Sequence, residues 1–260
     1  MILRRVTANF RRQDWTAVVI ELVVVVLGVF IGLQASNWNE ERETDAKAAH
    51  FADSLKADMR EEDWGYQLLI AYYGEVLANA ERAVNALDGT APLADEALLI
   101  SAYRATQYKS RLRRRSTYDE LTSTGTIGLI RDPILRDTAM RLYNVSTIEN
   151  LAREGMQSRY REAFRMTLPT AVQRALGANC GDRYIEPGDY AAIPGTLEHP
   201  CESGLSAAVI AESAKALRAN RELVPLLRLR IADIETRLVD LNSNNRAILK
   251  QLRSIAQDKP

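Results

Sequence analysis

The chain has 260 residues and balances 34 Lys and Arg against 34 Asp and Glu, so its formal net charge at pH 7 is zero. A neutral chain has no general attraction to polyanions, which argues against nucleic-acid binding. The length is sufficient to build one sizeable hydrophobic core.

Near the N-terminus, residues 15–35 (WTAVVIELVVVVLGVFIGLQA) form an apolar run that contains a single acid, Glu21. At about 1.5 Å per helical residue this run spans roughly 31 Å, which matches a hydrocarbon core of about 30 Å. No other stretch of the chain is comparably apolar. The sequence therefore predicts a tail over residues 1–14, a transmembrane helix over residues 15–36 and a water-soluble domain over residues 37–260.

Basic residues are distributed unequally about this span. The 15 residues after Ala35 contain Arg42 and Lys47 among four acids, whereas four arginines precede the span: Arg4, Arg5, Arg11 and Arg12. The bias predicts that the N-terminal tail is cytoplasmic and that the domain lies in the periplasm of a bacterium, anchored in the inner membrane. Trp15 and Trp38 are spaced as two interfacial aromatic residues would be.

A cleaved signal peptide is the alternative to an anchor, with residues 22–33 as its apolar core and cleavage after Ala35. Leu33 stands where such a site needs a small residue. The charged, helix-forming run that follows the span also contains no turn signal. The sequence thus favours an uncleaved anchor.

The predicted span carries a polar and small-residue stripe. At 100° per residue, Glu21, Gly28 and Gly32 fall within about 40° of one another. Gly28 and Gly32 form a G-x-x-x-G element, which lets two helices approach closely, and a carboxyl group in lipid needs a partner. We expect this face to be a helix-association interface. In the two alternatives, Glu21 reaches the inner interface by snorkelling, or it belongs to a proton or ion relay.

Apolar seams continue at both ends of the domain. Residues 55–87 place apolar side chains at alternating steps of four and three, broken only by Glu62, and predict a stalk that extends the transmembrane helix and ends at Asp88 and Gly89. Residues 231–255 form a second seam, interrupted by Asn245. Asn245 is either a specificity device within the seam or a solvated break in it.

Shorter helices are predicted between the seams, over residues 93–115, 116–125 and 133–168. Asp132 and Pro133 form a cap-then-proline start for the last of these. A further helix is expected from Ser206, with an interruption near Asn220 and Pro225. Without a convincing strand, the sequence predicts an all-α fold, with a helical bundle that has coiled-coil-like seams.

Cys180 and Cys201 bracket a stretch rich in Gly and Pro, within an expected loop over residues 177–205. In an oxidising compartment a disulfide between them would stabilise the fold by roughly 3 kcal/mol. The alternatives are two unpaired thiols, or a metal site that also uses His199. The H-x-C spacing of such a site matches no common zinc pattern.

No catalytic signature is present, because the common nucleophile, phosphate-loop, dinucleotide and redox motifs are all absent. We therefore expect a protein that is not an enzyme and that has no catalytic, cofactor-binding or metal-binding residue. The densest basic run consists of Arg111, Arg113, Arg114 and Arg115. It is interpreted as a solvated or salt-bridged segment rather than a ligand site, with the acidic cluster at residues 61–63 as an internal partner.

The run from Glu21 to Glu40 (ELVVVVLGVFIGLQASNWNE) resembles the N-terminal signature of a bacterial family of single-pass membrane proteins of unknown function. Residues 118–133 (YDELTSTGTIGLIRDP) resemble a recurrent element of that family's soluble part. The resemblance implies a membrane-anchored helical protein and carries over no activity and no catalytic residue. The loop over residues 177–205 has no place in the family pattern, which suggests a local insertion.

Together these features predict a periplasmic helical protein that works by self-association or by binding another envelope protein, besides its contact with the lipid bilayer. One alternative is an accessory or ligand-sensing subunit of an envelope transporter or ion-driven complex, in which Glu21 supplies a charge within the membrane. The other is an envelope hydrolase with an unrecognised site.

Overall fold

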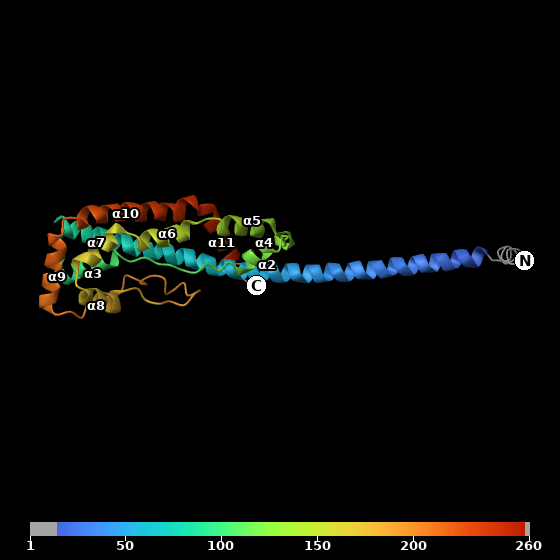
Figure 1. Cartoon of the computed structure of the whole chain (residues 1–260), viewed down its shortest axis with the longest axis horizontal. Coiled ribbons are helices and arrows are strands. Elements are labelled where there is room, and N and C mark those ends of the chain that lie inside the picture. Colours follow the sequence, from blue (N-terminus) through green and yellow to red (C-terminus); the bar gives the residue numbers. More distant parts are fainter. Residues whose placement is uncertain (1–14, 258–260) are drawn as a thin grey trace, which may run out of the picture. The chain divides into compact units, whose positions relative to one another are not determined.

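The computed structural model describes residues 15–257, which form helices and no strand. The chain divides into two compact units, Met1–Ala52 and Asp53–Pro260, and one helix, α2 (Trp15–Leu87), contributes residues to both (Figure 1). The prediction of an all-α fold with a long apolar helix near the N-terminus is confirmed. The expected cytoplasmic tail, residues 1–14, lies outside the described residues.

In the first unit, the apolar side chains of α2 are exposed from Val19 to Leu33; Ile31, for example, is 65% exposed. This segment is long and apolar enough to cross a membrane. Because so large an apolar surface is unfavourable in water, it needs a lipid or protein environment.

In the second unit, residues 53–87 of α2 form the central element of the core. Eight of the nine apolar seam positions predicted from the sequence are buried: Leu55, Met59, Tyr66, Leu69, Tyr73, Val76, Ala80 and Ala83. The ninth, Leu87, is partly buried and is the last residue of the helix. Gly89 follows with φ 85°, a left-handed conformation that ends helices at little cost to glycine.

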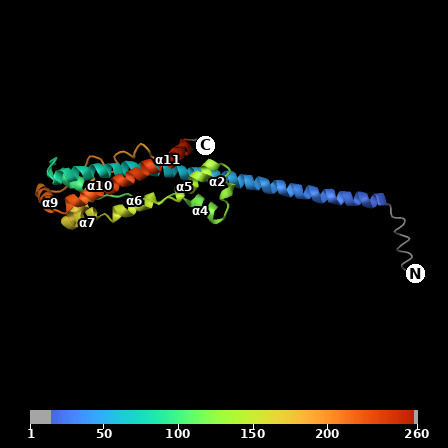
Figure 2. The ribbon, with the colours of Figure 1, turned by 90° about the horizontal axis from the view of Figure 1, so that it is seen from above.

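The remaining helices of the second unit are α3 (Asp95–Arg104), α4 (Ser116–Ser123), α5 (Pro133–Tyr143), α6 (Thr147–Met156), α7 (Arg159–Thr167), α8 (Thr170–Cys180), α9 (Ala207–Ala219), α10 (Leu223–Val239) and α11 (Arg246–Gln257). A 3₁₀ turn, η1 (Ile127–Leu129), follows α4, and a π-helical turn, η2 (Asp240–Asn244), joins α10 to α11. Helix α3 packs against α8 and α9, α10 against α7, and α11 against α5. Helices α10 and α11 run beside α2 in the opposite direction (Figure 2).

Two predicted helix starts are correct. The Asp132 carboxylate accepts hydrogen bonds from the backbone N–H groups of Ile134 and Leu135, and Pro133 is the first residue of α5. Ser206 caps α9 in the same way. The helix interruption expected near Asn220 is also present, but Pro225 lies inside the first turn of α10, where its missing N–H is tolerated.

The single helix predicted over residues 93–115 is wrong, because α3 ends at Arg104 and residues 105–115 form neither helix nor strand. Arg111 and Arg113 both reach Glu62, whereas Leu112 between them is 94% exposed. An alternation of this kind requires an extended backbone, in which every second side chain points to the same side. Tertiary pairing with Glu62 therefore prevails over helical propensity here.

The long helix predicted over residues 133–168 is likewise wrong, since it is divided into α5, α6 and α7. The Arg113 guanidinium donates hydrogen bonds to the Leu142 and Val145 carbonyls, at 2.9 and 3.0 Å. These carbonyls lie at the end of α5 and just beyond it. A buried charged side chain thus satisfies acceptors that a continuing helix would have used.

Asn245 follows the π-helical turn and is 8% exposed. Its side-chain amide donates to the Asp240 carbonyl at 2.8 Å. The polar residue in the predicted C-terminal seam therefore satisfies the backbone of a local irregularity, and the apolar pattern resumes in α11 with Ile248, Leu252 and Ile255 buried.

Candidate functional site

The predicted helix-association face lies in the first unit. Glu21, Gly28 and Gly32 are exposed along α2. A Cβ atom placed on Gly28 or Gly32 would meet nothing within 4 Å. Within the described residues, the glycine face is therefore open to an external partner.

The two cysteines lie in the second unit and form a disulfide, with their Cα atoms 5.4 Å apart. Cys180 is the last residue of α8, so the irregular loop begins at Gly181 and not at residue 177, as the sequence had suggested. His199 does not complete a metal site: its Nε2 lies 2.9 Å from the Gly181 carbonyl oxygen. Over residues 15–257, no cluster of His, Cys, Asp and Glu suited to a metal ion is found.

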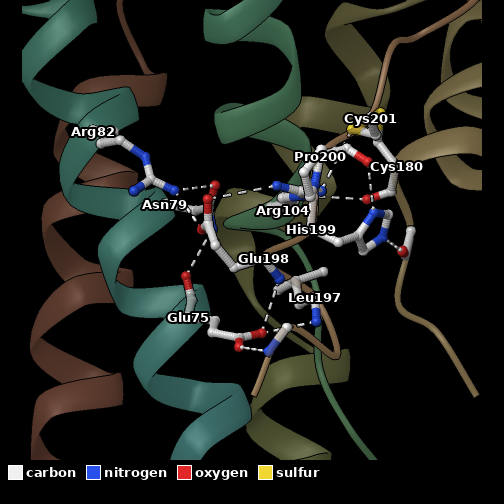
Figure 3. Close-up of polar contacts among 12 residues, drawn as sticks. Glu75, Asn79, Arg82, Arg104, Cys180, Leu197, Glu198, His199, Pro200 and Cys201 are labelled. Carbon is white, nitrogen blue, oxygen red and sulfur yellow. Dashed lines mark hydrogen bonds and ion pairs between the residues drawn. A yellow bond between two sulfur atoms is a disulfide. The ribbon is translucent and has the colours of Figure 1, made fainter. Parts of the chain in front are cut away.

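Arg104 of α3 holds both ends of the disulfide-closed loop (Figure 3). Its guanidinium donates to the Cys180 carbonyl at 3.2 Å and to the His199 carbonyl at 2.7 Å. The same group lies 3.4 Å from the Cys201 sulfur. Arg104 is 3% exposed, and burial lowers the pKa of its guanidinium while the charge of Glu198 opposes that change.

Two carboxylates fix the middle of the loop against α2. Glu75 accepts hydrogen bonds from three backbone N–H groups, those of Gly195, Leu197 and Glu198, at 2.8 to 2.9 Å. Glu198 in turn accepts from the Asn79 amide at 2.8 Å and from Arg82 (Figure 3). We call this set the loop clamp: Glu75, Asn79, Arg82, Arg104 and Glu198.

The loop clamp adjoins a surface hollow of about 280 Å³, which is lined in part by Ile100, Arg104 and Cys201. Its carboxylates and guanidinium groups are engaged with one another or with the backbone. The arrangement therefore positions the loop, and the sulfur atoms are bonded to each other rather than held as reactive thiols.

The loop makes a second set of contacts farther along α2. The Trp64 indole donates to the Asp189 carbonyl at 3.1 Å, and the Tyr190 hydroxyl donates to Asp63 at 2.9 Å. Burial raises the pKa of Asp63, and the hydrogen bonds from Tyr190 and Gln67 act in the opposite direction. The loop is thus attached to α2 at two separate places.

A buried ionic cluster joins the basic run to the acidic one. Glu62 has no exposed surface and lies 3.0 Å from Arg111 and 3.2 Å from Arg113. Gly65 provides the space for this, because a Cβ there would lie 2.1 Å from the Arg111 guanidinium carbon. The expected internal pairing is present, and Arg114 also pairs with Glu61.

Sequence reasoning singled out the cysteines, the basic run and the acidic cluster, but it missed the loop clamp. Glu75 and Glu198 are separated by more than a hundred residues, and neither belongs to a motif. Glu62 could be detected in the sequence, because it is the one polar position in the otherwise apolar seam of residues 55–87.

Comparisons with protein-family models, with curated proteins and with solved structures gave no match to this chain.

Proposed function

We propose that this protein is a membrane-anchored helical protein that works by association, either with a second copy of itself or with another envelope protein. The observation that carries the proposal is the open face of α2 that bears Glu21, Gly28 and Gly32 within an exposed apolar segment. The protein is proposed to act without catalysis and without a cofactor.

The chemistry of this face suits a helix partner in lipid. Glycines four residues apart allow two backbones to approach closely, so that van der Waals contacts replace contacts with lipid. A carboxyl group in hydrocarbon is costly unless it is paired, and a protonated Glu21 can donate a hydrogen bond across a helix interface.

The proposed location is the bacterial inner membrane, with the N-terminus in the cytoplasm and the domain in the periplasm. The arginines before the span support this orientation. The disulfide between Cys180 and Cys201 supports it independently, because such bonds persist in oxidising compartments.

An accessory or ligand-sensing subunit of an envelope transporter or ion-driven complex is the second candidate. Glu21 favours it, because an ionisable group within a span commonly marks an ion pathway or a contact with one. In that role the partner of α2 is a different membrane protein.

The test is self-association of the full-length protein in lipid vesicles, followed by energy transfer between labelled copies. Replacing Gly28 and Gly32 by Ile should weaken association by at least about tenfold, because the added side chains separate the backbones. The matched control replaces Val26 and Phe30, on other faces, by Ile and should change association little.

Glu21→Gln distinguishes the two candidates. Glutamine retains hydrogen-bonding capacity but cannot ionise, so association should persist in this variant. Unchanged association in the glycine variant would overturn the proposed interface. Loss of cellular function in Glu21→Gln with association intact would favour the ion-driven role.

A further inference from the structure

Helix α11 carries a row of basic side chains along one face. Arg246, Lys250 and Arg253 follow steps of four and three, which places them within about 60° of one another at 100° per residue. All three are exposed. They line a surface hollow of about 540 Å³ together with Asn242, Leu249, Ser254 and Gln257, and among the described residues no carboxylate lines it. We call this the α11 hollow.

The basic row is held in a fixed orientation by the opposite face of the helix. Ile248, Leu252 and Ile255 are buried, and Gln251 accepts hydrogen bonds from Thr138 and Arg141 of α5. Leu249, which is 6% exposed, lines the hollow and belongs to the buried side of the helix as well. The three cationic groups are therefore displayed by a packed helix and not by a loose terminus.

Within the part of the chain that the structure describes, Arg246 and Lys250 have no acidic partner, and Arg253 interacts with one only through its charge. Over residues 15–257, Arg246, Lys250 and Arg253 form no ion pair and no side-chain hydrogen bond. The charge of Arg253 reaches Asp63 of α2, which is buried; its Oδ2 accepts hydrogen bonds from Tyr190 and Gln67, while its Oδ1 has no hydrogen-bond partner among the described residues. Like charges at this spacing on a helix repel one another, so the row costs stability unless an anion lies beside it.

The helix is interrupted immediately before this row. The π-helical turn η2 precedes α11 and contributes Asn242 to the hollow. Turns of this kind are uncommon within α-helices and occur often at functional sites. The π-helical turn is thus a second feature of the α11 hollow, and it does not depend on the charges of the basic row.

We propose that the α11 hollow binds a small soluble ligand that carries two or more phosphate groups. Guanidinium and ammonium groups are the side chains that bind phosphate, the first in a bidentate manner and the second as a point charge. Seven residues separate Arg246 from Arg253, so the row extends for about 10 Å along the helix, which exceeds the reach of a single phosphate. This site is separate from the association face of α2 and does not depend on it.

The experiment is titration calorimetry of the full-length protein in neutral detergent, with tripolyphosphate and inorganic phosphate as probes. Tripolyphosphate should bind at least about tenfold more tightly than inorganic phosphate, and added salt should weaken it. Replacing Arg246, Lys250 and Arg253 by Gln should reduce tripolyphosphate affinity by at least about tenfold.

The matched control replaces an equal number of exposed basic residues elsewhere: Arg174, Lys215 and Arg221. It should keep affinity within about threefold, since it changes net charge but not the hollow. Circular dichroism should show that neither triple variant unfolds at a lower temperature than the unaltered protein, and relief of repulsion in the row should make the α11 variant slightly more stable.

Three outcomes would overturn the proposal. Equal losses in the two triple variants would indicate a general charge effect, and equal affinity for the two probes would remove the requirement for several phosphates. Binding to vesicles that contain phosphatidylglycerol, but to neither soluble probe, would assign the row to a membrane surface instead.

Discussion

Two glutamates of α2, Glu62 and Glu75, each hold an irregular segment of the chain, but through different kinds of contact. Glu62 is wholly buried and pairs with the arginines of residues 105–115. Glu75 is partly buried and accepts backbone N–H groups from the disulfide-closed loop. The first is mainly a contact between charges, with one hydrogen bond from the Arg114 backbone N–H, whereas the second satisfies only dipoles of the loop backbone.

The difference bears on what each contact contributes. A buried ion pair contributes little more to the free energy of unfolding than a well-packed apolar pair would. Removal of one partner, however, leaves the other charge buried without a partner and without water. A carboxylate that accepts backbone N–H groups at a partly exposed site can be replaced in part by water. We therefore expect residues 105–115 to depend strongly on Glu62, and the loop to depend on Glu75 only in part, since Arg104 and the disulfide hold it as well.

The largest effect is expected for Glu62→Gln. It removes the acidic partner of Arg111 and leaves Arg113 with only the half-exposed Glu149 at 3.5 Å, and should lower the free energy of unfolding by about 3–5 kcal/mol. Chemical denaturation of the full-length protein measures this. Glu61→Gln is the matched control, because the Arg114 to Glu61 pair is partly exposed, at 60% and 31%, and should contribute less than about 1 kcal/mol. Similar losses in the two variants would contradict the contrast between a buried charge and an exposed one.

A smaller effect is expected for Glu75→Gln. The amide oxygen can still accept, but the amide nitrogen cannot, so at least one of the three backbone donors loses its partner. The free energy of unfolding should fall by about 1–2 kcal/mol. Hydrogen exchange should accelerate at Gly195, Leu197 and Glu198, and Glu81→Gln on the exposed side of α2 serves as the control. Unchanged exchange at these amides would show that the loop is held without Glu75.

The smallest effect concerns the pH dependence of the loop clamp. Burial raises the pKa of Glu198, but the hydrogen bond and charge of Arg82, aided by Asn79 and Arg104, outweigh it, so the pKa lies below its ordinary value of 4.5. Because the folded-state pKa is the lower one, the contribution of Glu198 is complete above pH 4.5 and is lost as the pH falls through the lowered pKa.

The measurement is hydrogen exchange of the loop in the unaltered protein and in Glu198→Gln. The difference between the two proteins separates the titration of Glu198 from that of the other groups that titrate in acid. The difference in loop protection between the two proteins should be present near pH 6 and disappear in acid, with a magnitude below about 1 kcal/mol, since Glu198 is substantially exposed. A difference that stays constant from pH 6 to pH 3 would contradict the assignment.

The sequence by itself determined the features that depend on neighbouring residues. The apolar run of residues 15–35 can be recognised from the sequence as a candidate membrane span, because composition and length alone define such a segment. The buried seam of α2 and the starts of α5 and α9 follow from helical periodicity and from caps at Asp132 and Ser206, which act over a few residues.

Only the tertiary structure decided the features in which distant residues meet. Nothing local to residues 105–115 signals an extended backbone, because that geometry comes from Glu62, and nothing local to residue 144 signals a break, because Arg113 takes the carbonyls there. The loop clamp is of the same kind, since Glu75 meets donors about 120 residues away. Burial gives such contacts their strength, because a charge removed from water must find a partner wherever the fold supplies one.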